Sequence, residues 1–192
     1  APEKAVVAYR VFGMKAAAVE KSLADSVELN FNLNAVGDSP VALAVSTATL
    51  NLIPAVLQLR RASGSALIGG SVRDCDDKVM FGARILVYTT DGELVAEGSA
   101  ADDPHYRYFD STGFPSPVQP WPHVDGFFAA IHIPSTESEY LVAVWGRTKA
   151  GGKLQRIACE RVPALPNALT LSALQPRRSP SPDCPDDAPK GW

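Results

Sequence analysis

Alternating apolar and polar residues recur along this chain with the two-residue period of half-buried strands. The clearest case is SVELNFNLNAV, residues 26–36, where valine, leucine and phenylalanine alternate with glutamate and asparagine. Residues 5–14 are rich in valine and tyrosine, which favours another strand. The intervening residues 14–25 fit either a short helix or a loop. We therefore predict a small β unit over residues 1–62.

Residues 41–59 carry no charged side chain, so a membrane span has to be considered, because about 20 apolar residues cross a bilayer. Serine, threonine and asparagine interrupt this segment, and Pro54 divides it. The alternation in STATLNL favours strands instead. We expect two strands of the N-terminal β unit here, and a membrane span is not expected.

A second set of strand signals, at roughly ten-residue spacing, follows a small-residue linker at residues 61–66. Asp91-Gly92 and Asp125-Gly126 provide turns of the kind that join hairpin strands. Many short strands separated by turns predict an all-β fold, an antiparallel β-sandwich over residues 66–175. Strands are expected at residues 67–72, 83–89, 94–99, 127–133, 140–147, 154–162 and 169–174. In residues 127–133 one face is expected to carry Phe127, Ala129, Ile131 and Ile133, and the other face Phe128, Ala130 and His132.

The order of these motifs resembles the carboxypeptidase regulatory-like domain, a transthyretin-like sandwich, over about residues 66–147. The matching letters are GSVRD at 70–74, GARILV at 82–87, DG at 91–92, DGFF at 125–128, IP at 133–134 and YLVAV at 140–144. Two features depart from the family: a long insertion precedes Asp125, and Ser138-Glu139 replaces the usual glycine. The resemblance implies a secreted accessory module without a catalytic site. Residues 27–52 are also similar to the LEA-type-2 sandwich.

The insertion at residues 105–123 combines prolines with several aromatic side chains. These candidate binding residues are Tyr106, Tyr108, Phe109, Phe114 and Trp121. If the rings are exposed, they favour a protein partner over a glycan, because no acidic cluster lies beside them to bind sugar hydroxyls. The alternative is that they cover the open edge of the sandwich and complete its core.

Proline and charge dominate residues 176–192, so this tail is predicted to be extended. We expect the tail to dock along a neighbouring subunit, with Trp192 as its apolar anchor.

Three cysteines, Cys75, Cys159 and Cys184, are disulfide candidates. One bond and one spare cysteine suit an oxidising compartment, and the sequence leaves the three pairings open. The chain begins at Ala1 without the regions of a signal peptide, which we interpret as a mature extracytoplasmic chain, with trimming during expression as the alternative. Its net charge of −3, with both signs dispersed, argues against a nucleic-acid partner.

Residues able to carry chemistry do not form a recognised motif. The chain contains no G-x-S-x-G, HExxH, CxxC or phosphate-binding glycine loop. His105, His123 and His132 are interpreted as loop histidines, and residues 74–77 (DCDD) as a charged turn and not a calcium loop. We therefore expect no enzymatic activity, cofactor or metal.

These observations predict a non-enzymatic extracytoplasmic interaction module that serves as an accessory subunit of a larger assembly. It is expected to bind protein partners, or copies of itself, through its sandwich edge, aromatic insertion and tail. The alternative is a carbohydrate-binding module that uses residues 105–123.

Overall fold

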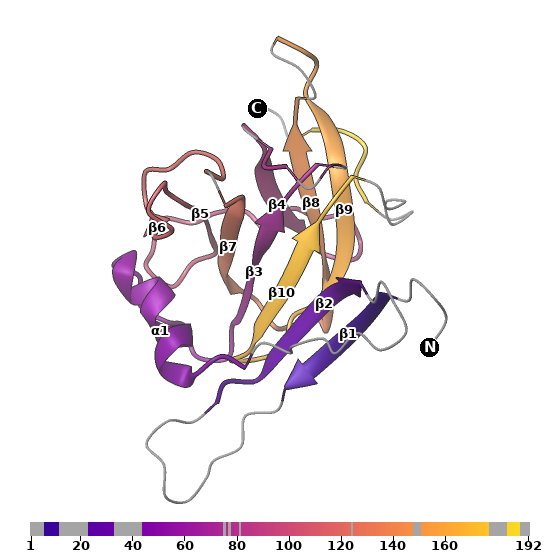
Figure 1. Ribbon diagram of the computed structural model, residues 1–192. Helices are drawn as coiled ribbons and strands as arrows, with labels where there is room; N and C mark the ends of the chain where they lie inside the picture. Colours follow the sequence, from indigo (N-terminus) through magenta and orange to yellow (C-terminus); the bar gives the residue numbers. More distant parts are fainter. Residues whose placement is uncertain are drawn as a thin grey trace, which may run out of the picture.

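The computed structural model describes residues 6–11, 23–32, 44–74, 76, 78–80, 82–123, 125–147, 151–176 and 184–188. Strands are the main regular structure of this part of the chain, and one helix, α1 (Thr47–Val56), accompanies them (Figure 1). The strands are β1 (Val6–Val11), β2 (Ser26–Asn32), β3 (Ala66–Val72), β4 (Arg84–Tyr88), β5 (His105–Phe109), β6 (Pro115–Ser116), β7 (Phe127–Ile133), β8 (Glu139–Gly146), β9 (Gln155–Pro163) and β10 (Leu169–Leu174).

These strands form two sheets (Figure 1). The larger has seven strands in the order β1-β2-β10-β3-β7-β5-β6, and the smaller has three in the order β4-β8-β9. The predicted all-β sandwich is therefore confirmed. One detail differs from the expected antiparallel sheet, because β10 runs parallel to both of its neighbours, β2 and β3. The chain enters β10 from β9 in the other sheet, so no hairpin fixes an antiparallel direction.

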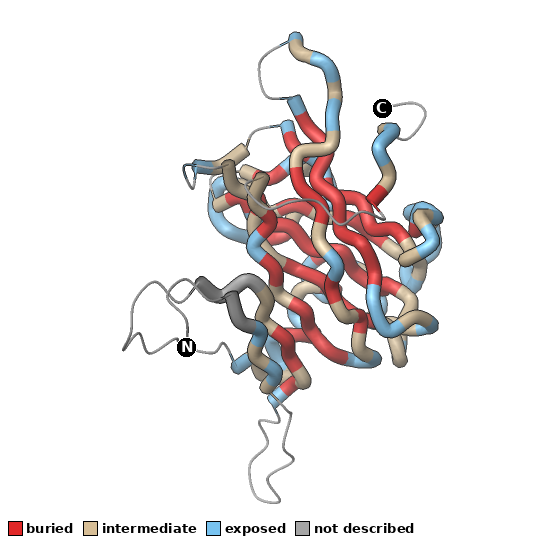
Figure 2. The backbone as a smooth tube through the Cα atoms, turned by 90° about the vertical axis from the view of Figure 1, so that its right-hand side faces the viewer, coloured by how far each residue is buried: buried red, intermediate tan, exposed pale blue. Residues whose placement is uncertain are grey.

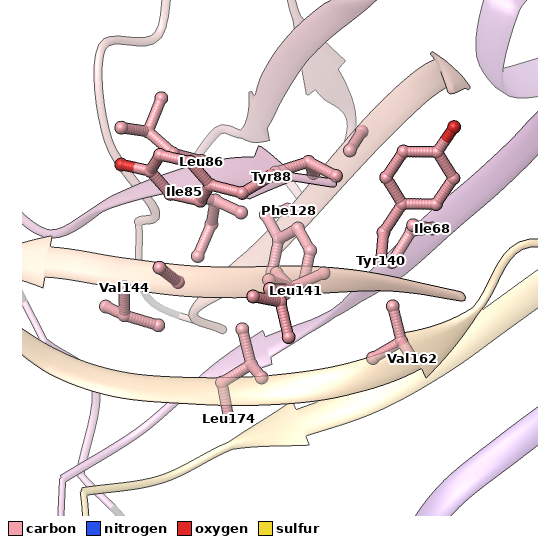
Figure 3. Packing of buried hydrophobic residues seen from close by; sticks show 14 of the residues in the cluster. Ile68, Ile85, Leu86, Tyr88, Phe128, Tyr140, Leu141, Val144, Val162 and Leu174 are labelled. Atoms are coloured by element: carbon pink, nitrogen blue, oxygen red, sulfur yellow. The ribbon is translucent and has the colours of Figure 1, made fainter. Parts of the chain in front are cut away.

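The main hydrophobic core lies between the two sheets and takes side chains from both (Figure 3). Ile68 and Phe128 come from the larger sheet, and Ile85 and Val144 from the smaller one. Buried residues run through the strands, whereas exposed residues gather in the connections (Figure 2). Full burial of each such side chain stabilises the fold by about 1.5–3 kcal/mol.

The first two strands belong to the same sheet as the central strands. β2 pairs with β10, and the Leu169 amide donates to the Asp25 carbonyl at 2.9 Å where the two strands begin. β1 then pairs with β2 and ends the sheet. The described residues of the predicted N-terminal β unit thus extend the larger sheet of the sandwich.

Residues 47–56 form helix α1, so the prediction of strands at residues 41–59 is wrong for this part. The Ser46 hydroxyl caps the helix by accepting from the Thr49 amide at 3.0 Å. Leu50 and Leu57 lie on one helical face and pack on the outer face of the larger sheet. The alternation in this short segment predicts a strand, but its leucines also fit the period of a helix. Burial of the leucines against the sheet selects the helix. No helix in the described residues is long and apolar enough to cross a membrane.

The strand predicted at residues 94–99 is also wrong. Only an isolated bridge joins Leu94 to Tyr88, and the Val95 amide donates to the Val87 carbonyl at 2.9 Å. The strand that continues the larger sheet instead lies in the supposed insertion, where β5 pairs with β7. Residues 105–109 (HYRYF) do show the alternation of a strand. They were assigned to a loop because they belong to an aromatic, proline-containing stretch.

A β-bulge at the end of β7 changes which face Ile133 occupies. Ala66 pairs with Ile133 and Ile68 with Ala130, so β7 has one extra residue between the two pairs. His132 adopts a positive φ of 59° at this point. Ile133 therefore joins the core between the sheets, whereas the predicted alternation placed it on the opposite face.

The described part of the tail folds back on β9 of its own chain. Cys184 forms a disulfide with Cys159, their Cα atoms 6.5 Å apart, which selects one of the pairings that the sequence leaves open. The Arg156 guanidinium donates to the Cys184 carbonyl at 2.6 Å and to the Pro185 carbonyl, and pairs with Asp186 at 2.9 Å. Residues 184–188, the tail segment, are thus fixed by one covalent and several polar contacts.

The tail segment lies on the outer face of the smaller sheet. Strand register places Leu86, Ala143 and Cys159 on one face. The neighbouring Glu160 carboxylate accepts from the Ser172 hydroxyl of β10 at 3.1 Å, so Glu160 faces the other sheet and Cys159 faces away from it. The predicted anchor Trp192 and the third cysteine, Cys75, lie outside the described residues.

Candidate functional site

A groove of about 390 Å³ opens at the edge of the sandwich where β4 faces β5. Residues 94–97 border it after β4, and residues 117–120 border it after β6. Two of the predicted aromatic residues, Tyr106 and Tyr108, also line it. Both rings are buried, 8% and 5% exposed, so they form the base of the groove and are not exposed binding residues. The alternative interpretation of the aromatic insertion, in which it completes the core, is correct for these two tyrosines.

The two tyrosine hydroxyls close the free edge of β4. The Tyr108 hydroxyl accepts from the Ile85 amide at 2.9 Å, and the Tyr106 hydroxyl accepts from the Val87 amide at 3.4 Å. The Tyr106 hydroxyl also donates to the Val95 carbonyl. Side chains of the larger sheet thus bind backbone amides of β4 in the smaller sheet. A further strand added beside β4 would need these amides for its own hydrogen bonds. A ligand in this groove has to be recognised mainly through side chains.

Burial dominates the ionisation of both tyrosines. It raises the pKa of Tyr108 to about 12, although the Ile85 amide bond acts in the opposite direction. It raises the pKa of Tyr106 further, against the bond from Val87. Because the folded pKa lies above that of an unfolded tyrosine, stability is present below pH 10 and falls as pH rises toward 12.

Removing a tyrosine hydroxyl is expected to destabilise the fold. Tyr108→Phe leaves the buried Ile85 amide without its partner, so the free energy of unfolding should fall by about 1–3 kcal/mol in urea denaturation. Tyr88→Phe is the matched control, since the buried Tyr88 hydroxyl lies near the Trp145 indole but meets no partner at hydrogen-bond geometry within the described residues. It should change stability by less than about 0.5 kcal/mol. Equal losses in the two variants would show that the hydroxyl bond to β4 does not stabilise the edge.

Charged side chains form one wall of the groove. The Arg107 guanidinium donates to the Glu97 carboxylate at 2.8 Å and to the His105 Nδ1 at 3.0 Å. The same Glu97 oxygen accepts from the Tyr106 amide at 2.8 Å, which fixes the carboxylate against β5. Arg84, at the start of β4, is exposed at the rim. The wall therefore combines the Arg107–Glu97 ion pair with a second arginine at the rim.

The exposed apolar residues of the groove are ones that sequence analysis did not single out. Val118 is 85% exposed and Leu94 is 41% exposed, and both line the groove. Neither residue has a distinctive sequence signal, because an isolated valine or leucine in a loop is common. Their importance follows only from their position in a shared groove.

The remaining predicted aromatic residues do not gather into one surface. Phe109 packs edge-to-face on Phe127, the ring centroids 5.8 Å apart, over the outer face of the larger sheet. Phe114 and Trp121 are 58% and 40% exposed, and neither lines the groove. The predicted set is thus divided among the groove base, the outer sheet face and exposed loop positions.

The predicted polar candidates do not form a metal site in the described part of the chain, where no cluster of three potential ligands occurs. His105 and His132 are not loop histidines, because they are buried on β5 and β7. The amides of Asp76 and Lys78 both donate to the Asp74 carboxylate, so this carboxylate stabilises a turn. Cys75 and Asp77 of the same acidic stretch lie outside the described residues.

The structure defines an all-β sandwich with a side-chain-lined groove at one edge. Comparisons with family models, curated proteins and solved structures find no match to this chain. The resemblance to the carboxypeptidase regulatory-like domain therefore stays a prediction.

Proposed function

We propose that this chain is a non-enzymatic extracytoplasmic interaction module that binds an extended segment of a protein partner in the edge groove. The observation that carries this proposal is the groove itself, which is lined by the exposed apolar residues Leu94 and Val118 together with the buried tyrosines Tyr106 and Tyr108. Buried tyrosines need little reordering on binding, which favours affinity.

The chemistry of the groove favours a partner segment with an apolar and an acidic side chain. Leu94 and Val118 would contact the apolar group, and the positive charge of Arg84 and Arg107 along the groove would lie near the acid. Pairing as an extra strand on β4 is disfavoured, because Tyr106 and Tyr108 already bind amides on its free edge. Recognition would therefore depend on side chains of the partner.

An oxidising compartment is supported by the bond between Cys159 and Cys184, since such bonds persist outside the reducing cytosol. The role of an accessory subunit rests on the family resemblance and on the same groove. A carbohydrate-binding role would need a platform of exposed rings, and among the predicted aromatic residues that the structure describes only Phe114 and Trp121 are exposed by more than a third.

Val118→Asp is expected to weaken partner binding at least about tenfold, because it places a carboxylate where an apolar group should be buried. A photoreactive side chain at position 118 would first crosslink the partner in envelope extracts of the source cells. The purified partner would then be titrated against the wild-type chain and the variants by calorimetry.

Leu52→Asp is the matched control, since Leu52 is also exposed, 54%, but lies on α1. It should leave the affinity unchanged. If Val118→Asp binds as tightly as the wild type, the groove is not the interaction site. Binding of oligosaccharides in place of a protein, lost on Trp121→Ala, would support the carbohydrate-binding alternative.

A further inference from the structure

Two buried histidines lie side by side behind the groove wall. His105 on β5 and His132 on β7 are 5% and 4% exposed, and their ring centroids are 6.2 Å apart. Each ring bonds to a carbonyl of the turn that leads into β5: His105 to Ala100 at 2.9 Å, and His132 to Asp103 at 3.1 Å. The pair therefore attaches residues 98–103, the histidine-bound turn, to the sheet.

The bonding partners determine the protonation state of both rings. Arg107 can only donate, so the His105 Nδ1 that it contacts has no proton, and the proton on Nε2 donates to the Ala100 carbonyl. The Asp103 carbonyl can only accept, so Nδ1 of His132 carries the proton. Its Nε2 is buried without a hydrogen-bond partner in the described residues. Both histidines are therefore neutral in this fold.

Positive charges near the two histidines disfavour the addition of a second proton to either ring. Arg107 contacts His105 directly, and Arg61 lines a cavity of about 10 Å³ beside His132. Burial lowers the pKa of His132, and the neighbouring His105 and Arg61 lower it further. The bond to the Asp103 carbonyl and the charge of Asp102 act in the opposite direction but do not prevail. The Asp103 carboxylate itself accepts from the Ala100 amide at 2.7 Å.

Protonation would break this arrangement at defined atoms. A proton on Nδ1 of His105 would face the N–H of Arg107, so a donor would meet a donor and two positive charges would meet. A proton on Nε2 of His132 would bury an unpaired cation next to Arg61. Because the folded pKa of His132 is below its unfolded value, the closed turn loses stability as pH falls below about 6.5.

The groove lies next to the histidine-bound turn in the chain. Glu97 and Arg107 both line the groove, and Glu97 directly precedes the histidine-bound turn. Arg107 bonds to His105 on one side and to Glu97 on the other. Repulsion from a charged His105 would therefore move Arg107 and with it the wall of the groove.

We propose that His105 and His132 form a pH-sensitive latch, which holds the 98–103 turn and the Arg107 wall of the groove closed at neutral pH and opens in acid. The latch rests on the proposed function only in its last step, the loss of partner affinity on opening. The opening itself concerns this chain alone and can be measured without any partner.

Hydrogen exchange of the full chain between pH 7.5 and pH 5.0, corrected for intrinsic exchange rates, tests the opening. Protection of residues 98–105 is expected to fall about tenfold or more at pH 5.0, whereas β8 keeps its protection. The double variant His105→Gln/His132→Asn should remove this pH dependence. Glutamine can still donate to the Ala100 carbonyl, and asparagine tolerates the positive φ at position 132.

Protection that does not change with pH in the wild type, or that changes equally in the double variant, would overturn the latch. If the double variant does not fold, two other experiments take its place. One is hydrogen exchange of His123→Gln, and the other is NMR titration of the histidines in the wild type. His123 lies outside this pair, so its substitution should leave the pH dependence intact, and His132 should titrate below about pH 6.5. A latch that opens as expected while Val118→Asp leaves partner binding unchanged would reject the proposed function alone.

Discussion

Gly70→Ala is expected to lower the free energy of unfolding by about 3 kcal/mol or more. A Cβ at this position would lie 1.8 Å from the backbone oxygen of Ser172 on the neighbouring strand β10. A backbone atom cannot rotate away as a side chain can, so β3 and β10 would have to separate. These two strands lie in the middle of the larger sheet, where such a separation disturbs the pairing on both sides.

Gly69→Ala is the matched control from the adjacent position. Its Cβ would meet its nearest atoms at 3.5–3.8 Å, which is ordinary contact, so a change of less than about 1 kcal/mol is expected. Urea denaturation followed by far-UV circular dichroism measures both variants. Equal stability of the two would mean that β10 does not approach β3 as closely as the structure shows.

Removing the bond between Cys159 and Cys184 is expected to lower the free energy of unfolding by about 3 kcal/mol, because the bond closes a chain segment with a sequence separation of 25. Release of the tail segment should also uncover apolar surface around Cys159, whose strand neighbours on the same face are Ala143 and Leu86. The variant Cys159→Ala/Cys184→Ala should therefore denature at lower urea and bind more of an apolar fluorescent dye at neutral pH.

Cys75→Ala is the control for the pairing. It should keep the bond and change stability little, and thiol titration should detect one free thiol in the denatured wild type and none in this variant. A Cys75→Ala variant that loses as much stability as the double variant would contradict the pairing of Cys159 with Cys184. Peptide mapping under non-reducing conditions gives the same answer independently.

Several strands of the fold were predictable because their local pattern and their tertiary environment agree. Residues 127–133 and 169–174 were expected as strands and form β7 and β10 with those bounds. Residues 47–56 were misread, because a short uncharged stretch fits a helix as well as a strand. What decides between the two is the apolar outer face of the larger sheet, which only the assembled sheet provides.

The candidate site was predictable only in part. The aromatic insertion was predicted to bind a partner, and two of its residues, Tyr106 and Tyr108, are buried at the base of the groove. Arg107 and Val118 line the groove and could not have been chosen from the sequence, because nothing in the letters brings them near β4. Burial and proximity depend on which strands become neighbours.

The sequence by itself determined that the chain forms an all-β sandwich, since two-residue periodicity and turn residues are local properties. Only the tertiary structure decided that Cys159 bonds to Cys184 and that β10 inserts between β2 and β3. It also decided that His105 and His132 share one buried site. The disulfide, the position of β10 and the histidine pair all join residues that are far apart in the chain. Local sequence preferences do not specify contacts over such sequence separations. Packing of the two sheets selects them together.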